Sequence, residues 1–71
     1  MTNTELLRKK IDDSGYKLTF IAKQLGITYQ GFLKKSNNET EFKATEIQIL
    51  KTLLNLTDDE RDCIFFASNV D

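Results

Sequence analysis

The chain of 71 residues carries a formal net charge of −1, with 39% hydrophobic and 30% charged residues, one cysteine and no histidine. This length supports one small hydrophobic core, and the composition is typical of a folded domain rather than a disordered segment. A lone cysteine excludes a disulfide framework, and we expect neither a zinc site nor another cofactor. No apolar run approaches the roughly 18 residues of a membrane span, so we expect no membrane segment. The unpaired cysteine and the polar, acidic N-terminus, which is unlike an export signal, suit a reducing, cytoplasmic location.

The charges are distributed unevenly along the sequence. Five lysines against two glutamates give residues 17–43 a net charge of +3, whereas two basic and six acidic residues give residues 44–71 a net charge of −4. One interpretation is that these charges simply belong to ordinary solvated surface. Alternatively, the basic segment forms a face that binds a polyanion, and the acidic segment forms a face that repels nucleic acid or attracts a basic protein.

The first predicted helix starts with Thr2 and Glu5, which have the spacing of a capping box. Leu7 and Ile11 follow one turn apart, so they should share a buried face. Gly15 should end this helix, because glycine readily adopts the left-handed conformation found there.

The second predicted helix covers residues 18–25, and Gly26 should end it for the same reason. Its apolar residues recur with the i, i+3, i+4, i+7 spacing of one buried face. They are Leu18, Ile21, Ala22 and Leu25. Thr28 is a good N-cap for a third helix over residues 29–36.

The fourth predicted helix follows a turn at Asn37 and Asn38 and a polar loop in which Phe42 should anchor on the core. Thr45 and Gln48 have the spacing of a second capping box. The buried face of this helix should contain Ile47, Leu50 and Leu54, with Leu53 beside them.

The fifth predicted helix starts at Thr57, in a third capping box whose acidic residues suit the positive end of the helix dipole. Cys63 is expected in the core. One ring of Phe65 and Phe66 should also be buried, leaving the other for a dimer contact or a lid. The helix is expected to continue through Ala67 and fray at the end of the sequence.

These elements predict an all-α, compact five-helix domain over residues 1–71, with a helix-turn-helix at about residues 18–36. The two short helices should meet at a tight turn and present the third helix outward, where it can enter a DNA major groove. An ordinary helical hairpin in a small bundle is the alternative. The residues expected to pack this corner are Ile21, Ala22, Leu25, Gly26, Ile27 and Phe32.

A family resemblance runs through residues 21–28 (IAKQLGIT), 42–47 (FKATEI) and 56–62 (LTDDERD), the last leading into 64–67 (IFFA). Nearly the whole chain resembles the small Cro/C1-type (XRE) helix-turn-helix regulators of temperate phages. The resemblance implies a five-helix domain, often dimeric, that controls lysogeny-versus-lysis promoters in a bacterial host cell. Similar proteins include modulator-of-repression antirepressors, which bind the phage's own repressor instead of, or as well as, operator DNA.

The resemblance implies that outward residues of the third helix contact the partner. Gln30 suits adenine, because its amide can donate and accept in a bidentate pair. Thr28 and Lys34 are expected at phosphates, with Lys17 and Lys35 adding sequence-independent attraction. The full predicted contact set is Thr28, Tyr29, Gln30, Leu33, Lys34, Lys35 and Lys17.

The sequence departs from the family pattern beside the third helix. Many relatives carry a basic residue where Tyr29 stands, and they tend to be basic where Asn38 and Glu39 stand. Tyr29 and Leu33 lie one turn apart and should form an exposed apolar pair, which is typical of a protein interface. Alternatively, Tyr29 contacts a thymine methyl or a phosphate, and Leu33 packs along the DNA groove.

Two functions stay open, and neither is catalytic. The first is a Cro-like regulator that dimerises and binds a short, roughly symmetric operator. The second is an antirepressor that binds the DNA-binding domain of a phage repressor, and an antitoxin-like partner is a weaker third. No small-molecule substrate is expected, because the carboxylates at residues 12–13 and 58–60 lie at predicted helix ends and suit capping better than metal or acid–base chemistry.

Overall fold

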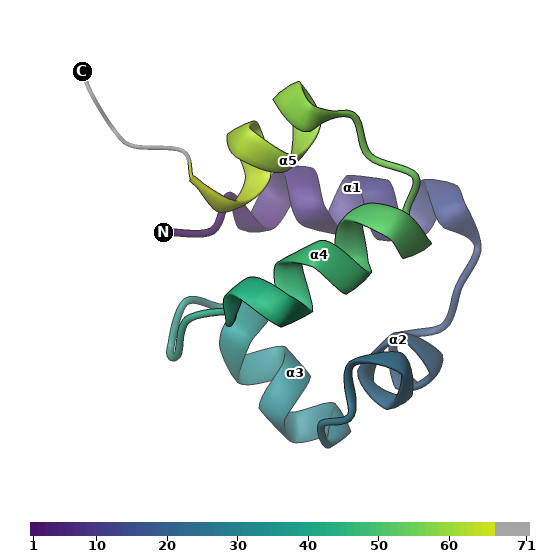
Figure 1. Ribbon diagram of the computed structural model, residues 1–71. Helices are drawn as coiled ribbons and strands as arrows, with labels where there is room; N and C mark the ends of the chain where they lie inside the picture. Colours follow the sequence, from purple (N-terminus) through teal and green to yellow (C-terminus); the bar gives the residue numbers. More distant parts are fainter. Residues whose placement is uncertain (67–71) are drawn as a thin grey trace.

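Five α-helices make up the part of the chain that the computed structural model describes, residues 1–66. In chain order they are α1 (Thr4–Ser14), α2 (Leu18–Leu25), α3 (Tyr29–Ser36), α4 (Ala44–Leu53) and α5 (Asp58–Phe65). α1 packs against α5, α2 packs against α3, and α4 contacts both α2 and α5 (Figure 1). The Cα radius of gyration of 11.2 Å is close to the ~11 Å expected for a compact domain of this length. The predicted compact, all-α, five-helix fold is confirmed.

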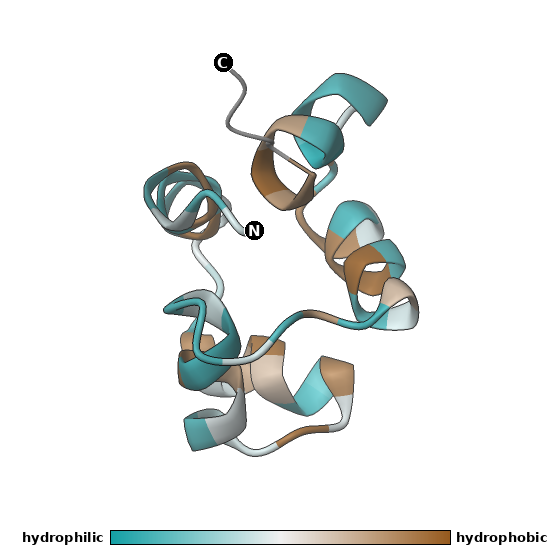
Figure 2. Cartoon of the chain, turned by 90° about the vertical axis from the view of Figure 1, so that its left-hand side faces the viewer, coloured by the Kyte–Doolittle hydropathy of each residue, from teal (hydrophilic) through white to brown (hydrophobic). Residues whose placement is uncertain are grey.

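Each helix supplies one large side chain to the centre of the core. These side chains, each at most 1% exposed, are Leu7, Ile21, Phe32, Leu50 and Ile64 in chain order. Burying a side chain of this size contributes about 1.5–3 kcal/mol to stability. In Figure 2 the helices alternate hydrophobic and hydrophilic residues, as expected when only one side of each helix is buried.

The loop between α3 and α4 is anchored by Phe42, as predicted. Its side chain is buried, and its ring packs edge-on against Phe32 at 6.1 Å and Phe65 at 5.4 Å between ring centroids. Such edge-to-face contacts add about 0.5–1.5 kcal/mol beyond the area they bury. The loop therefore joins α3 to α5 through the core.

The predicted boundaries of α2 and α3 are confirmed. Gly26 follows α2 with φ +74°, the left-handed conformation that glycine adopts without a steric penalty. Thr28 caps α3 by accepting a hydrogen bond from the Gly31 backbone N–H at 2.9 Å. The turn after α3 is also as predicted, because Asn38 takes a positive φ of 66°.

The start of α1 differs from the prediction. Asn3, not Thr2, is the N-cap, and its Oδ1 accepts from the Leu6 backbone N–H at 3.1 Å. Thr2 is instead held by Asn38, which accepts from the Thr2 N–H at 2.9 Å and donates to the Thr2 carbonyl at 3.0 Å. The side chain that binds Thr2 thus comes from 36 residues away along the sequence.

The start of α4 also differs from the prediction. The helix begins at Ala44, so Thr45 is already helical and does not act as its N-cap. The Glu46 carboxylate accepts a hydrogen bond from the Lys43 backbone N–H at 2.8 Å and caps the first turn.

The start of α5 follows the prediction, but its buried face does not. Thr57 and Glu60 form the reciprocal capping box, with hydrogen bonds of 2.9 and 3.1 Å. Cys63 is exposed, so its predicted place in the core is wrong. Successive helical residues are turned by about 100°, and Ile64 with Phe65 takes the core side. α5 ends at Phe65, so Phe66, which was expected within the helix, lies just beyond it and is exposed. The expected helical Ala67 and the fraying of residues 68–71 lie outside the described residues.

Candidate macromolecule-binding surface on α2 and α3

The corner between α2 and α3 is built from a three-residue turn, 26–28. In Figure 1 α2 is seen nearly end-on while α3 runs across the view, so the two axes cross steeply. The Ile27 backbone N–H donates to the Ala22 carbonyl at 3.1 Å, which closes the end of α2. Of the six residues predicted to pack this corner, Ile21, Ala22, Leu25 and Phe32 are buried, Ile27 is half-buried, and Gly26 forms the exposed turn.

The outward side of α3 carries most of the predicted contact residues. Tyr29, Gln30 and Lys34 are exposed, as is the capping residue Thr28. The Thr28 oxygen already accepts from the α3 backbone, so only its hydroxyl proton is free for a phosphate. Since Phe32 packs the opposite side of α3 into the core, these side chains face away from the core.

Lys35 does not belong to this exposed surface, contrary to the prediction. Its Nζ lies 3.1 Å from the Glu46 carboxylate and 3.1 Å from the Glu41 carbonyl oxygen. The Lys35 side chain is 13% exposed and that of Glu46 only 5%. The lysine therefore ties α3 to α4, and its charge is neutralised by a buried carboxylate.

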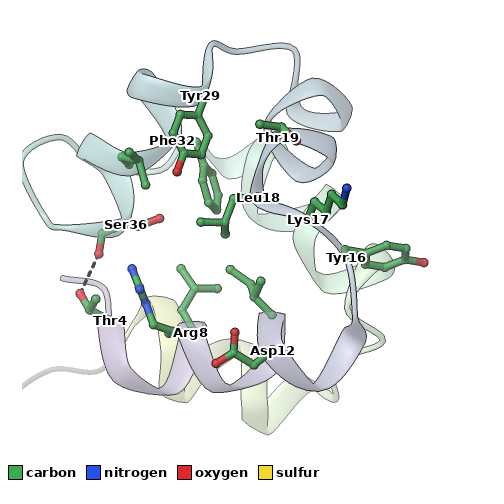
Figure 3. Close-up of a pocket in the computed structure, with 13 residues that line it drawn as sticks. Thr4, Arg8, Asp12, Tyr16, Lys17, Leu18, Thr19, Tyr29, Phe32 and Ser36 are labelled. Carbon is green, nitrogen blue, oxygen red and sulfur yellow. Dashed lines mark hydrogen bonds between the residues drawn. The ribbon is translucent and has the colours of Figure 1, made fainter.

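Tyr29 and Leu33 do not form a flat exposed pair. Tyr29 is 43% exposed, whereas Leu33 is half-buried. Both side chains line a groove between α3 and α1, and Figure 3 shows Tyr29 facing this space. The pair is thus one wall of a concave surface, a placement that the helical spacing alone could not give.

A stacked pair of aromatic side chains was not anticipated from the sequence. Tyr16 and Phe20 stack with 5.1 Å between ring centroids and an interplanar angle of 28°. Both rings are about 40% exposed and lie beside Lys17, at the start of α2. Their i, i+4 spacing, outside the buried stripe of α2, is the signal that identifies such a pair.

Several lysines around α2 and α3 keep an exposed charge. Within residues 1–66 their side chains make no ion pair. They are Lys17, Lys23, Lys34 and Lys43. Lys17 and Lys34 are predicted contact residues, so two of the three predicted lysines remain available to an anion.

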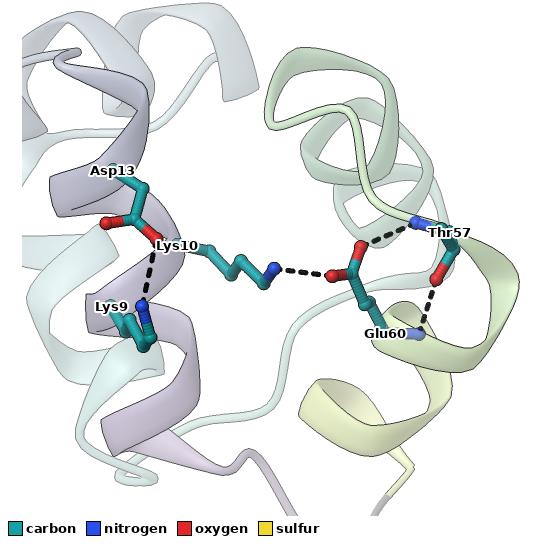
Figure 4. Close-up of polar contacts among 5 residues, drawn as sticks. All are labelled: Lys9, Lys10, Asp13, Thr57 and Glu60. Carbon is teal, nitrogen blue, oxygen red and sulfur yellow. Dashed lines mark hydrogen bonds and ion pairs between the residues drawn. The ribbon is translucent and has the colours of Figure 1, made fainter.

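The acidic residues of α5 are partly neutralised within the fold. Glu60 pairs with Lys10 of α1, as Figure 4 shows, and Asp58 lies 3.3 Å from Lys51. The hydrogen bond from Lys10, followed by that from the Thr57 backbone, lowers the pKa of Glu60 below its usual value. The Glu60 carboxylate therefore has a structural role between α1 and α5.

Two other kinds of site find no support in the described part of the chain. No three cysteine or carboxylate side chains within residues 1–66 are grouped so as to hold a metal ion. The helices there are too short and too polar to cross a bilayer.

The chain was compared with models of protein families, with curated proteins and with solved structures. None of the three comparisons finds a match. Its function has therefore to be inferred from its own residues and their arrangement.

Proposed function

We propose that the chain is a helix-turn-helix transcriptional regulator that binds operator DNA through α3, in a lysis/lysogeny switch of a temperate phage within the bacterial cytoplasm. The observation that carries this proposal is the two-sided character of α3. Gln30 and Lys34 are exposed on one side while Phe32 is buried on the other. A short helix held in this way can place its N-terminal side chains at base edges.

Each exposed polar side chain has a distinct part in this proposal. The Gln30 amide reads an adenine by donating and accepting at the same base edge. Lys34 and Lys17 bind phosphates, which position the protein without selecting a sequence. A homodimer of the chain would read two half-sites about one helical turn of DNA apart.

Anisotropy titrations with a labelled duplex from the promoter region beside the gene test this proposal. Lys34→Ala should weaken binding to all sequences and reduce the slope of log K against log salt by about 0.9. Gln30→Ala should instead relax base choice at one position, because a bidentate pair contributes about 1–3 kcal/mol of discrimination. Lys9→Ala is the control, since Lys9 lies on α1 and pairs with Asp13. Absence of any complex at low salt would contradict operator binding.

A second candidate function is antirepression, and the exposed aromatic side chains favour it. Tyr16, Phe20 and Tyr29 are each 40–43% exposed, and aromatic residues are enriched at protein interfaces. In this case the surface binds the DNA-binding domain of the phage repressor and masks its operator contacts. The masses of complexes formed with the adjacent repressor and with promoter DNA, separately and together, distinguish the two functions. Tyr29→Ala should abolish the repressor complex and leave a direct DNA complex weakened at most.

A further inference from the structure

The groove between α1 and α3 has the size and lining of a small-molecule site. Its volume is about 390 Å³, within the roughly 300–1,000 Å³ typical of such sites. The floor is apolar and buried, and it is formed by Leu7, Ile11 and Phe32. Leu18 and Leu33, both half-buried, form apolar sides.

One end of this groove holds a buried hydroxyl group without a partner. Ser36 is only 6% exposed, and its Oγ makes no hydrogen bond within residues 1–66. The Ser36 carbonyl is occupied separately, because it accepts from Thr4 Oγ1 at 2.7 Å. In Figure 3 the Ser36 hydroxyl points into the groove. An unsatisfied buried hydroxyl is destabilising, and an occupant with a polar group would supply the missing hydrogen bond.

An unpaired guanidinium group lies at the same end. Arg8 projects from α1 toward Ser36 in Figure 3, and it makes no ion pair or hydrogen bond within residues 1–66. Arginine presents a planar fork of donors that matches a carboxylate. Asp12 lines the groove one turn further along α1, so an anionic group is favoured at the Arg8 end and disfavoured at the other.

We propose that this groove binds a small apolar carboxylate. The carboxylate lies between Arg8 and Ser36, and the apolar body covers Leu7, Ile11 and Phe32. The bound molecule also contacts Leu33 and Tyr29, so it changes the surface that α3 presents. Binding in this groove requires neither operator DNA nor a repressor.

An NMR titration of the protein alone with sodium octanoate, up to about 10 mM, tests this site. Methyl resonances of Leu7, Ile11 and Leu33 should shift with saturation. Octanamide is the neutral match and should bind at least about tenfold more weakly, because hydrogen bonds to charged groups are worth about 1.5–3 kcal/mol.

Substitutions then locate the carboxylate. Arg8→Gln should weaken octanoate binding about tenfold and Ser36→Ala about threefold. Lys9→Gln is the matched control, because it removes the same charge from the next position of α1 on an exposed side chain and should leave affinity unchanged. Arg8 is itself exposed, so its substitution tests the site even where Ser36→Ala disturbs the fold.

Three results with the unsubstituted protein would overturn the proposal. They are the absence of saturable shifts up to about 10 mM octanoate, equal binding of octanamide, and shifts that concentrate away from the groove. Equal weakening by Lys9→Gln and Arg8→Gln would show only a general charge effect and would also overturn it. Because the titration contains neither DNA nor repressor, its failure leaves the proposed function standing.

Discussion

The Glu46 carboxylate links α4 to α3 and also caps the first turn of α4. It accepts from the Lys43 backbone N–H at 2.8 Å and lies 3.1 Å from Lys35 Nζ. Both side chains of the ion pair are largely buried. A buried pair of this kind does not by itself raise stability, but removing one partner leaves an uncompensated charge in the interior.

Replacing Glu46 should therefore destabilise the fold strongly. We expect Glu46→Ala to lower the free energy of unfolding by about 3 kcal/mol, as measured by urea denaturation. Glu46→Gln should cost less, because its amide oxygen still accepts from the Lys43 backbone. Glu39→Ala is the control and should stay within about 0.5 kcal/mol, since Glu39 is exposed. Equal effects of the Glu46→Ala and Glu39→Ala variants would contradict the structural role of Glu46.

Between elements, α1 and α5 are joined at two places. The Asn3 backbone N–H donates to the Ile64 carbonyl at 2.6 Å, and Lys10 pairs with Glu60 near the start of α5. Glu60 also completes the capping box with Thr57. The protonation of one carboxylate thus affects both the α5 N-terminus and its contact with α1.

The lowered pKa of Glu60 predicts a loss of stability in acid. Because the folded-state pKa lies below the usual value of 4.5, the contribution is fully present above that pH. It is lost as the pH falls through the lower, folded-state pKa. Unfolding free energies measured by urea denaturation from about pH 6 to about pH 3 should fall less steeply for Glu60→Gln. Asp59→Asn is the exposed control, and equal pH slopes for wild type and Glu60→Gln would contradict this assignment.

Local signals in the sequence predicted all five helices, but they placed the N-caps of α1 and α4 at the wrong residues. α2 and α3 were predicted with their observed bounds, because Gly26 and Thr28 act on their immediate neighbours. Residues at the starts of α1 and α4 also contact distant residues, since Asn38 binds Thr2 and Lys35 pairs with Glu46. The spacing of residues within one helix carries no information about such contacts between distant residues.

The sequence predicted part of the candidate surface on α2 and α3 correctly. The helical phase of α3 places Gln30 and Lys34 outward once Phe32 is buried. Lys35 was misplaced, because its burial requires Glu46 from another helix. The groove beside Leu33 also depends on how α1 packs, and helical spacing within α3 carries no information about it.

Across the whole molecule, the net charge of −1 conceals a separation of charge. The unpaired lysines surround α2 and α3, whereas exposed acidic residues Asp58, Asp59 and Asp62 lie on α5. Figure 1 shows α5 and the α2–α3 corner at opposite ends of the fold, with α4 between them. A polyanion should therefore approach the α2–α3 end and be repelled from α5.

Backbone amide shifts provide the most direct test that the outward side of α3 is the contact surface. A ¹⁵N-labelled sample is titrated with the promoter duplex and, separately, with the DNA-binding domain of the adjacent repressor. We predict that amides of residues 28–34 shift with at least one of these additions while those of α5 stay in place. Unchanged amides at 28–34 with both additions, or a response confined to α5, would contradict the account.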